Sequence, residues 1–235
     1  MLDRTAIILG ASGSVGQALL REAVRCGGFG RILVMTRRPL DVQPETPVEE
    51  RIVPEMGPGK LSEAVVDALR GSGRNVTGFS VLGVGRGTAR LSLEEHRAVD
   101  VHLNAAFARG LRASGNVQHL AFMSAMGANI EARTTGSGAP GMARYSRVKG
   151  EAEAAVRNEG PAIVSIFRPA LIIGSRHTPR LLAFALEMLS PLTPAKFRPI
   201  RTTEIARAMV AAALNPPSQS TIYSYPEMME LAAGG

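Results

Sequence analysis

The stretch Thr5-Ala-Ile-Ile-Leu-Gly10-Ala-Ser-Gly13-Ser-Val-Gly16 decides the fold that we expect for this chain. Its first half is a short apolar run, typical of a buried β-strand. Its second half is a glycine-rich turn, and the following residues have helical spacing, with Val15, Leu19 and Ala23 on one face. A strand, a glycine turn and a helix in this order predict the opening of a parallel, doubly wound α/β sheet.

The alternation of strands and helices continues along the chain. Strands are expected at residues 5–9, 31–36, 48–53, 78–82, 117–124, 163–168 and 220–225. Helices are expected at residues 14–26, 61–70, 92–114, 142–158 and 203–214. Ser92 and Glu95 form a capping box at the start of the third helix. The pattern predicts a single Rossmann-type domain over residues 1–235.

The distribution of charged and aromatic residues indicates whether a nucleic acid is an expected partner. The chain has 27 basic and 20 acidic residues, but the basic residues are scattered, with no run longer than Arg37-Arg38, and aromatic residues make up only 4%. Nucleic-acid binders more often cluster their charge and interleave aromatic residues. We therefore expect no nucleic-acid partner. The surplus of arginine is either a compositional preference or an attraction for an anionic ligand.

Several sequence features bear on location and metals. No run of 18 apolar residues marks a membrane span, and the apolar part of the N-terminus is too short for a signal peptide. Cys26 is the one cysteine and has no partner for an internal disulfide, which fits a reducing compartment. We therefore expect a cytoplasmic protein. The histidines lack metal-ligand spacing, so no metal is expected, and surface or interface roles are favoured for His96 and His102.

The glycine turn has the spacing Gly10-x-x-Gly13-x-x-Gly16. A pyrophosphate must approach the backbone at a helix N-terminus, where free N–H groups and the helix dipole favour anions. Side chains at the three glycines would block the turn, the phosphate or the contact between helix and sheet. We therefore expect a dinucleotide to be bound by Gly10, Ser12, Gly13, Ser14, Val15 and Gly16. The alternative is a tight glycine turn without a ligand.

The end of the second expected strand indicates which dinucleotide is bound. An NAD site usually places Asp or Glu there to bind the ribose 2′-hydroxyl, whereas an NADP site uses arginine. In this chain Thr36 is followed by Arg37 and Arg38, and the first acid is Asp41. A guanidinium fork matches a 2′-phosphate, and a carboxylate would repel it. The strand end therefore predicts NADP(H), against the alternative of a solvated basic loop.

Tyr145 and Lys149 are four residues apart on the expected helix 142–158, so they share a face. A lysine ammonium stabilises a neighbouring phenolate, which makes the phenol a usable acid or base near neutral pH. The alternative is a pair on a solvent-facing helix. Asp100 and Asn104 are candidates to support the water network of this site, against the alternative of a plain polar helix face.

With these motifs, the chain resembles the atypical short-chain dehydrogenase/reductases, and among them the Tat-interacting-protein-like NAD(P)-binding oxidoreductases. The resemblance also rests on Leu82-Gly-Val-Gly85-Arg-Gly87, Met123-Ser124-Ala-Met-Gly127 and Arg168-Pro169. It implies that Ser124 hydrogen-bonds a substrate carbonyl, that Tyr145 donates the proton, and that Lys149 binds the nicotinamide ribose.

The resemblance also implies that Gly83 and Gly85, with Val84 between them, lie along the adenosine ribose, and that the backbone after Pro169 faces the nicotinamide. It places a substrate-covering segment at residues 175–200, in a small C-terminal lobe. Two positions depart from the family pattern. Ala125 follows Ser124 where many members have a second Ser or Thr. Glu55 is the nearest acid after the third strand, where these proteins often have Asp.

These residues favour one function and leave a second open. The favoured function is NADP(H)-dependent reduction of a small-molecule carbonyl compound. The alternative is a non-catalytic, NADP(H)-sensing regulatory protein that binds a protein partner, because atypical members of the family include such proteins.

Overall fold

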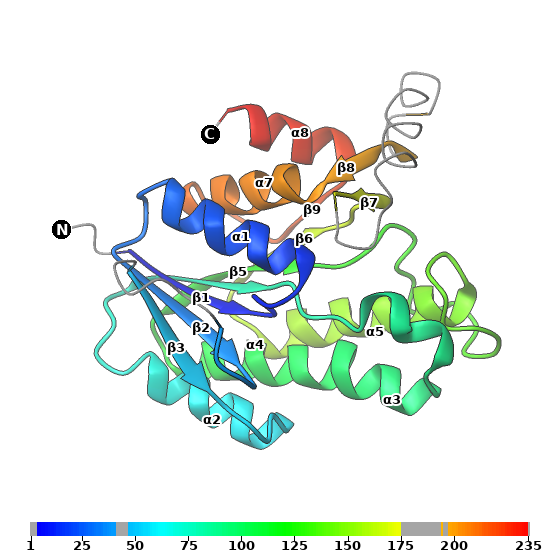
Figure 1. Ribbon diagram of the computed structural model, residues 1–235, viewed down its shortest axis with the longest axis horizontal. Coiled ribbons are helices and arrows are strands. Elements are labelled where there is room, and N and C mark those ends of the chain that lie inside the picture. Colours follow the sequence, from blue (N-terminus) through cyan, green and yellow to red (C-terminus); the bar gives the residue numbers. More distant parts are fainter. Residues whose placement is uncertain (1–3, 41–46, 175–193, 195–196, 235) are drawn as a thin grey trace.

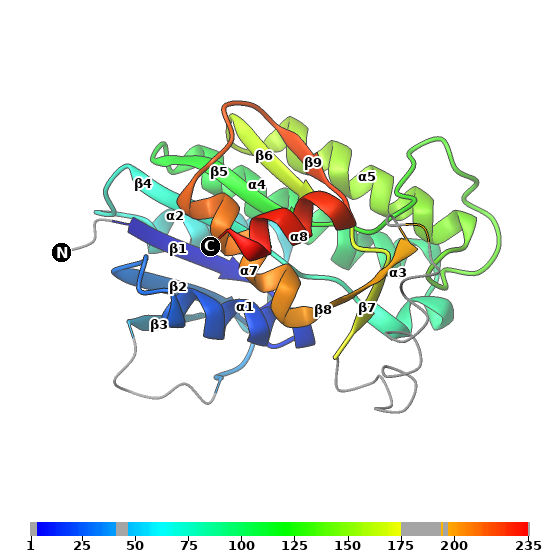
Figure 2. The same cartoon turned by 90° about the horizontal axis from the view of Figure 1, so that it is seen from above.

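One parallel sheet organises the protein. The structure, a computed structural model, describes residues 4–40, 47–174, 194 and 197–234, so most of the expected substrate-covering segment 175–200 lies outside the described residues. Seven strands run parallel in the order β3-β2-β1-β4-β5-β6-β9 (Figures 1 and 2). They are β1 (Arg4–Leu9), β2 (Arg31–Thr36), β3 (Val48–Ile52), β4 (Asn75–Ser80), β5 (Val117–Met123), β6 (Ile163–Phe167) and β9 (Thr221–Tyr223).

Helices cover both faces of the sheet, as expected of a doubly wound fold (Figure 1). One layer contains α1 (Ser14–Arg25) and α7 (Thr202–Leu214), with α8 (Tyr225–Ala233) packed on α7. The other layer contains α2 (Pro58–Ala68), α4 (Asn104–Ala113) and α5 (Ala143–Glu159). A second, two-stranded sheet pairs β7 (Leu171–Ile173) with β8 (Pro199–Arg201) beside the main one (Figure 2).

The core is divided by the sheet into two apolar clusters. Along β1, Ala6 and Ile8 face the layer of α1 and α7, whereas Ile7 and Leu9 face the layer of α2, α4 and α5. All four side chains are at most 1% exposed. Burial on both faces explains why this strand is a nearly continuous apolar run.

The expected elements agree with the structure except at a few ends. The helix expected at 61–70 begins at Pro58, because proline suits the first helical turn although the apolar pattern starts only at Leu61. The strand expected at 78–82 begins at Asn75, where the ladder with β1 already pairs polar residues. The elements β7, β8 and α8 were not expected. The two strands have three residues each, too few to show a period, and α8 follows the last strand after a single residue, Ser224.

The helix expected at 92–114 is divided into three parts. The capping box of Ser92 and Glu95 opens α3 (Leu93–Arg97), as expected. A π-helical segment (Ala98–Leu103) follows, and α4 continues from it. π-Helical turns inside longer helices often occur at functional sites, and this one contains Asp100.

His119 in β5 is a titratable side chain enclosed by the core. Its ring is 2% exposed, and Nε2 lies 2.8 Å from Ser165 Oγ. Burial lowers the pKa of His119 from 6.5 to about 4, because desolvation disfavours the imidazolium. The unfolded chain therefore binds a proton more readily than the folded protein between these two values, and stability decreases on acidification through this window.

We predict that His119 reduces the free energy of unfolding by about 2 kcal/mol between about pH 7 and about pH 5, since each pKa unit is worth about 1.4 kcal/mol. Urea unfolding of the wild type and His119→Gln at both pH values measures this contribution. The glutamine retains a hydrogen-bonding group for Ser165 but does not titrate. The same pH dependence in both proteins would contradict the prediction.

Candidate functional site

The glycine turn joins β1 to α1 at the carboxyl edge of the sheet. Gly10 has a φ of +91°, and a Cβ there would lie 2.7 Å from the backbone nitrogen of Leu82. A Cβ at Gly16 would overlap the carbonyl oxygen of Gly10. Gly13 differs, because a Cβ there would lie at an ordinary 3.5 Å from its nearest neighbour. The first and third glycines are therefore required by the turn itself.

Gly13 is the N-cap of α1, is exposed, and provides no side-chain cap for the helix. Ser12 is also exposed, Ser14 is half-buried, and Val15 packs into the core. The first turn of α1 therefore presents backbone N–H groups beside small residues, which is the arrangement that binds anions at helix N-termini.

Arg37 and Arg38 lie at the same edge of the sheet, directly after β2, which pairs with β1. Both are exposed, and no described residue forms a hydrogen bond or ion pair with either guanidinium. The Thr36 hydroxyl donates to the carbonyl oxygen of Arg38 at 2.6 Å and so fixes the backbone of this turn.

Tyr145 and Lys149 lie on one face of α5, as the sequence predicts. The ammonium of Lys149 is 5.8 Å from the centre of the Tyr145 ring and 2.6 Å from Asp100 Oδ1. Asp100 and Lys149 are 1% and 5% exposed. Burial alone would lower the pKa of Lys149 and raise that of Asp100, but their mutual attraction outweighs it, so the pKa of Lys149 is raised and that of Asp100 is lowered.

The loop after β4 closes over this ion pair. The backbone N–H of Val84 donates to Asp100 Oδ2 at 3.0 Å. A Cβ at Gly83 would lie 3.2 Å from Asp100 Oδ1 and 3.4 Å from the Lys149 ammonium, so the backbone passes close to both charges. Gly85 begins a short 3₁₀ helix (Gly85–Arg90) with a φ of +69°.

Asp100 and Asn104 are both 1% exposed, which rules out the solvated polar face that the sequence left open. The Asn104 amide donates to the carbonyl oxygen of Asp100 at 2.8 Å, and its oxygen pairs with the hydroxyl of Ser80 at the end of β4. Asn104 therefore anchors the π-helical segment to the sheet and holds Asp100 in place.

The surface or interface role that we expected for His96 is wrong. Its side chain is fully buried, and its ring centre is 5.9 Å from that of Tyr145. His102, on the same helix, is exposed as expected. The periodicity of the helix hid the difference, because a polar row that faces a buried site resembles a solvated face.

Ser124 directly follows β5 and is 3% exposed. Its backbone N–H donates to the carbonyl oxygen of Phe167 at 2.8 Å, and its buried hydroxyl has no hydrogen-bond partner within the described ranges. The N–H of Met126 donates to the carbonyl oxygen of Pro169 at 2.9 Å, so the ends of β5 and β6 are joined. Glu55 lies apart from these groups: it is exposed and paired with Lys60.

Sequence reasoning missed an ion pair between the buried Glu153 and the partly exposed Arg168. Glu153 is one turn beyond Lys149 on the same face of α5, and it binds the guanidinium of Arg168 through both carboxylate oxygens at 2.8 and 2.5 Å. The pair fixes the residue before Pro169. The i, i+4, i+8 spacing from Tyr145 to Glu153 is the signal that would have found it.

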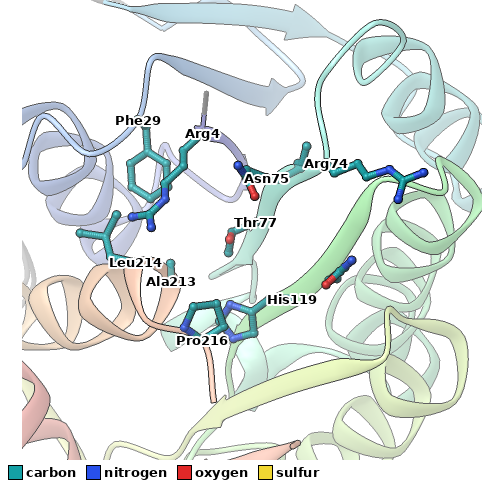
Figure 3. Close-up of a pocket in the computed structure, with 11 residues that line it drawn as sticks. Arg4, Phe29, Arg74, Asn75, Thr77, His119, Ala213, Leu214 and Pro216 are labelled. Carbon is teal, nitrogen blue, oxygen red and sulfur yellow. The ribbon is translucent and has the colours of Figure 1, made fainter. Parts of the chain in front are cut away.

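A cavity of about 150 Å³ lies elsewhere, at the amino ends of β1, β4 and β5 (Figure 3). Its wall combines polar groups of Thr77 and His119 with apolar groups of Phe29 and Leu214, and Arg4 extends over it. A cavity of this size and polarity suits a few water molecules. It lies at the edge opposite the glycine turn and Tyr145.

Within the described part of the chain, no helix has the length and apolar character of a bilayer span. No group of three or more His, Cys, Asp or Glu side chains among the described residues is placed to hold a metal ion.

The chain is similar to proteins named "Protein FMP52, mitochondrial" from two organisms. The protein from Eremothecium gossypii is 29% identical over 178 residues, which cover 74% of this chain and 68% of the relative. The protein from Debaryomyces hansenii is 27% identical over 222 residues, which cover 92% and 90%. No family model matches the chain. Both names overturn the expectation of a cytoplasmic protein.

Solved structures share the arrangement of the elements. A short-chain dehydrogenase/reductase from Serratia marcescens superposes with a TM-score of 0.66, at 16% identity, over 96% of this chain and 98% of that one. The fold is a Rossmann fold. MoeE5 in complex with UDP-glucose and NAD has the same fold, with a TM-score of 0.64 and 16% identity over 98% and 81% of the two chains.

We predict that Asp100→Asn lowers the free energy of unfolding by about 3 kcal/mol, because it leaves the Lys149 ammonium buried without its countercharge. Lys149→Met should restore most of this loss in the Asp100→Asn background, since it removes the unpaired charge. Urea unfolding of the wild type, both single variants and the double variant measures the coupling. Additive effects of the two substitutions would show that the pair is not a stabilising unit.

Proposed function

We propose that this chain is an NADP(H)-dependent oxidoreductase of the atypical short-chain dehydrogenase/reductase type, related to the Tat-interacting-protein-like members, and that it reduces a carbonyl compound. One observation carries the proposal: Tyr145 and an ion-paired, buried Lys149 lie together at the edge of the sheet where β4 ends and its following loop begins. Ligands of open α/β sheets bind outside the carboxyl ends of the strands. The NAD in the complex of MoeE5 supports a nicotinamide dinucleotide as the ligand.

The residues at this edge fit such a dinucleotide. Gly13 leaves the N-terminus of α1 open, so the pyrophosphate would be held there by backbone N–H groups and by Ser12 and Ser14. Arg37 and Arg38, unpaired among the described residues, would hold the 2′-phosphate.

The remaining contacts follow the edge of the sheet toward Tyr145. The backbone from Gly83 through Val84 to Gly85 would lie along the adenosine ribose. Lys149 would bind the nicotinamide ribose, and the backbone after Pro169 would face the nicotinamide ring.

Residues of this chain can serve the proton transfer and the binding of the carbonyl oxygen in this reaction. When bound, NADPH supplies the hydride that adds to the carbonyl carbon. Tyr145 donates its phenolic proton to the carbonyl oxygen, which gives the alcohol and leaves a phenolate that regains a proton from solvent. The Lys149 ammonium, fixed by Asp100, stabilises that phenolate. Ser124 hydrogen-bonds the same oxygen through its hydroxyl, which no described residue pairs.

We predict that NADPH binds at least about ten times more tightly than NADH, a difference of about 1.4 kcal/mol. The two guanidinium groups attract the 2′-phosphate, and arginine instead of Asp or Glu follows β2, where NAD sites usually place the carboxylate that holds the 2′-hydroxyl. Calorimetric titration measures both affinities in the wild type and in Arg37→Ala/Arg38→Ala, which should lose the preference. Gly13→Val is the control that should lose both ligands, because its side chain occupies the approach path of the phosphate. An unchanged preference in the double variant would remove the role of the arginines.

We predict that Tyr145→Phe retains NADPH affinity but loses about 10²–10⁴-fold in turnover, the usual worth of a general acid. The measurement is NADPH consumption by the wild type and Tyr145→Phe side by side, over a panel of aldehydes, ketones and quinones. Equal rates in both proteins would exclude Tyr145 as the proton donor. A wild type that binds NADPH, consumes none, and changes its affinity for a protein partner would instead be the sensing regulator.

A further inference from the structure

His96 lies close to Tyr145 and to the ion pair of Asp100 and Lys149, on which the proposed reaction depends. It lies on α3 and is fully buried. Its ring is tilted by 32° against that of Tyr145, with 5.9 Å between the centres. Its Nε2 is 3.8 Å from Asp100 Oδ1, the oxygen that holds the Lys149 ammonium at 2.6 Å.

Both ring nitrogens of His96 are buried and have no hydrogen-bond partner among the described residues. A buried polar atom without a partner is destabilising, because it has given up its hydrogen bonds to water. A phenyl ring at this position would fill the space without that cost. A native structure that keeps such a group calls for an explanation, and a role at the neighbouring site is one.

Asp100 offers that explanation, because its carboxylate already joins its own π-helical segment to the loop after β4 and to α5. Oδ2 accepts the N–H of Val84 from the loop after β4, and Oδ1 accepts the ammonium of Lys149 from α5. A movement of the His96 ring by about 1 Å would bring Nε2 within hydrogen-bond distance, about 2.9 Å, of the same Oδ1. Two ionisable groups lie close to His96: Asp100 in the π-helical segment and Tyr145 on α5.

We propose that His96 is a positioning residue of this site, with two separable contacts. Its Nε2–H donates to Asp100, so that Asp100 holds Lys149 against the nicotinamide ribose. Its ring supports the ring of Tyr145, so that the phenol points to the reacting oxygen. The inference rests on the proposed function and adds to it a residue that no motif contains.

Two substitutions separate the two contacts. His96→Phe retains a ring against Tyr145 but loses the N–H that would donate to Asp100. His96→Gln retains an N–H donor but loses the ring. Calorimetry with NADPH and with 2′,5′-ADP, which lacks the nicotinamide half, shows which half of the nucleotide site each variant affects. Turnover at saturating NADPH reports on Tyr145.

We expect His96→Phe to weaken NADPH binding by about tenfold and to leave 2′,5′-ADP binding unchanged, since the variant lacks the donor for a hydrogen bond to a charged group. We expect His96→Gln to bind NADPH within about twofold of the wild type but to lower turnover. His102→Phe, at an exposed histidine of the same helix, is the matched control and should change neither.

The outcomes separate this inference from the proposed function. Wild-type NADPH affinity in His96→Phe, or equal losses for both ligands, overturns the positioning role. If His96→Phe does not fold, a tenfold loss of NADPH affinity in the folded His96→Gln overturns it as well. A wild type that binds neither NADPH nor 2′,5′-ADP overturns the proposed function, and the inference with it.

Discussion

The ion pair between Asp100 and Lys149 is the contact on which the candidate site depends. Two opposite charges, each at most 5% exposed, sit 2.6 Å apart between α5 and the π-helical segment. Burying either charge alone would be costly, so each confines the other to one position. Asp100 extends the constraint to the loop after β4 through Val84, and Lys149 extends it to Tyr145 four residues before it on α5. One pair thus sets the relative position of a loop and two helices.

The opposite half of the site depends on backbone shape rather than charge. Gly10 and Gly16 let β1, α1 and the loop after β4 approach more closely than any side chain would allow. The result is an exposed helix N-terminus at the same edge of the sheet as Arg37 and Arg38, which follow the neighbouring strand β2. When binding groups such as this helix N-terminus and these arginines are already in place, a ligand can bind without first ordering the chain.

The sequence predicted most of the fold because its strands are buried on both faces, and such runs are conspicuous. β7 and β8 escaped because three residues show no period. The arrangement of the candidate site was predicted where a motif has fixed spacing, as in the glycine turn and in Tyr145 and Lys149. It was missed where contacts join distant segments: Glu153 meets Arg168, and His96 meets Tyr145, only after α3, α5 and β6 have packed. The sequence could not show whether the polar face of Asp100 pointed to water or to a lysine.

The π-helical segment Ala98–Leu103 makes the site sensitive to chain length rather than to residue type. A π-turn holds one residue more than an α-turn, and each residue of an α-helix turns the chain by about 100°. Loss of one residue within the segment would leave an ordinary α-helix that still packs on the sheet through α4. The same loss would rotate His96 away from the face that carries Asn104. A deletion of one codon here would thus retain the fold but separate the groups of the site. Conversely, the insertion of one codon into an uninterrupted α-helix would produce such a π-turn and could bring these groups onto one face.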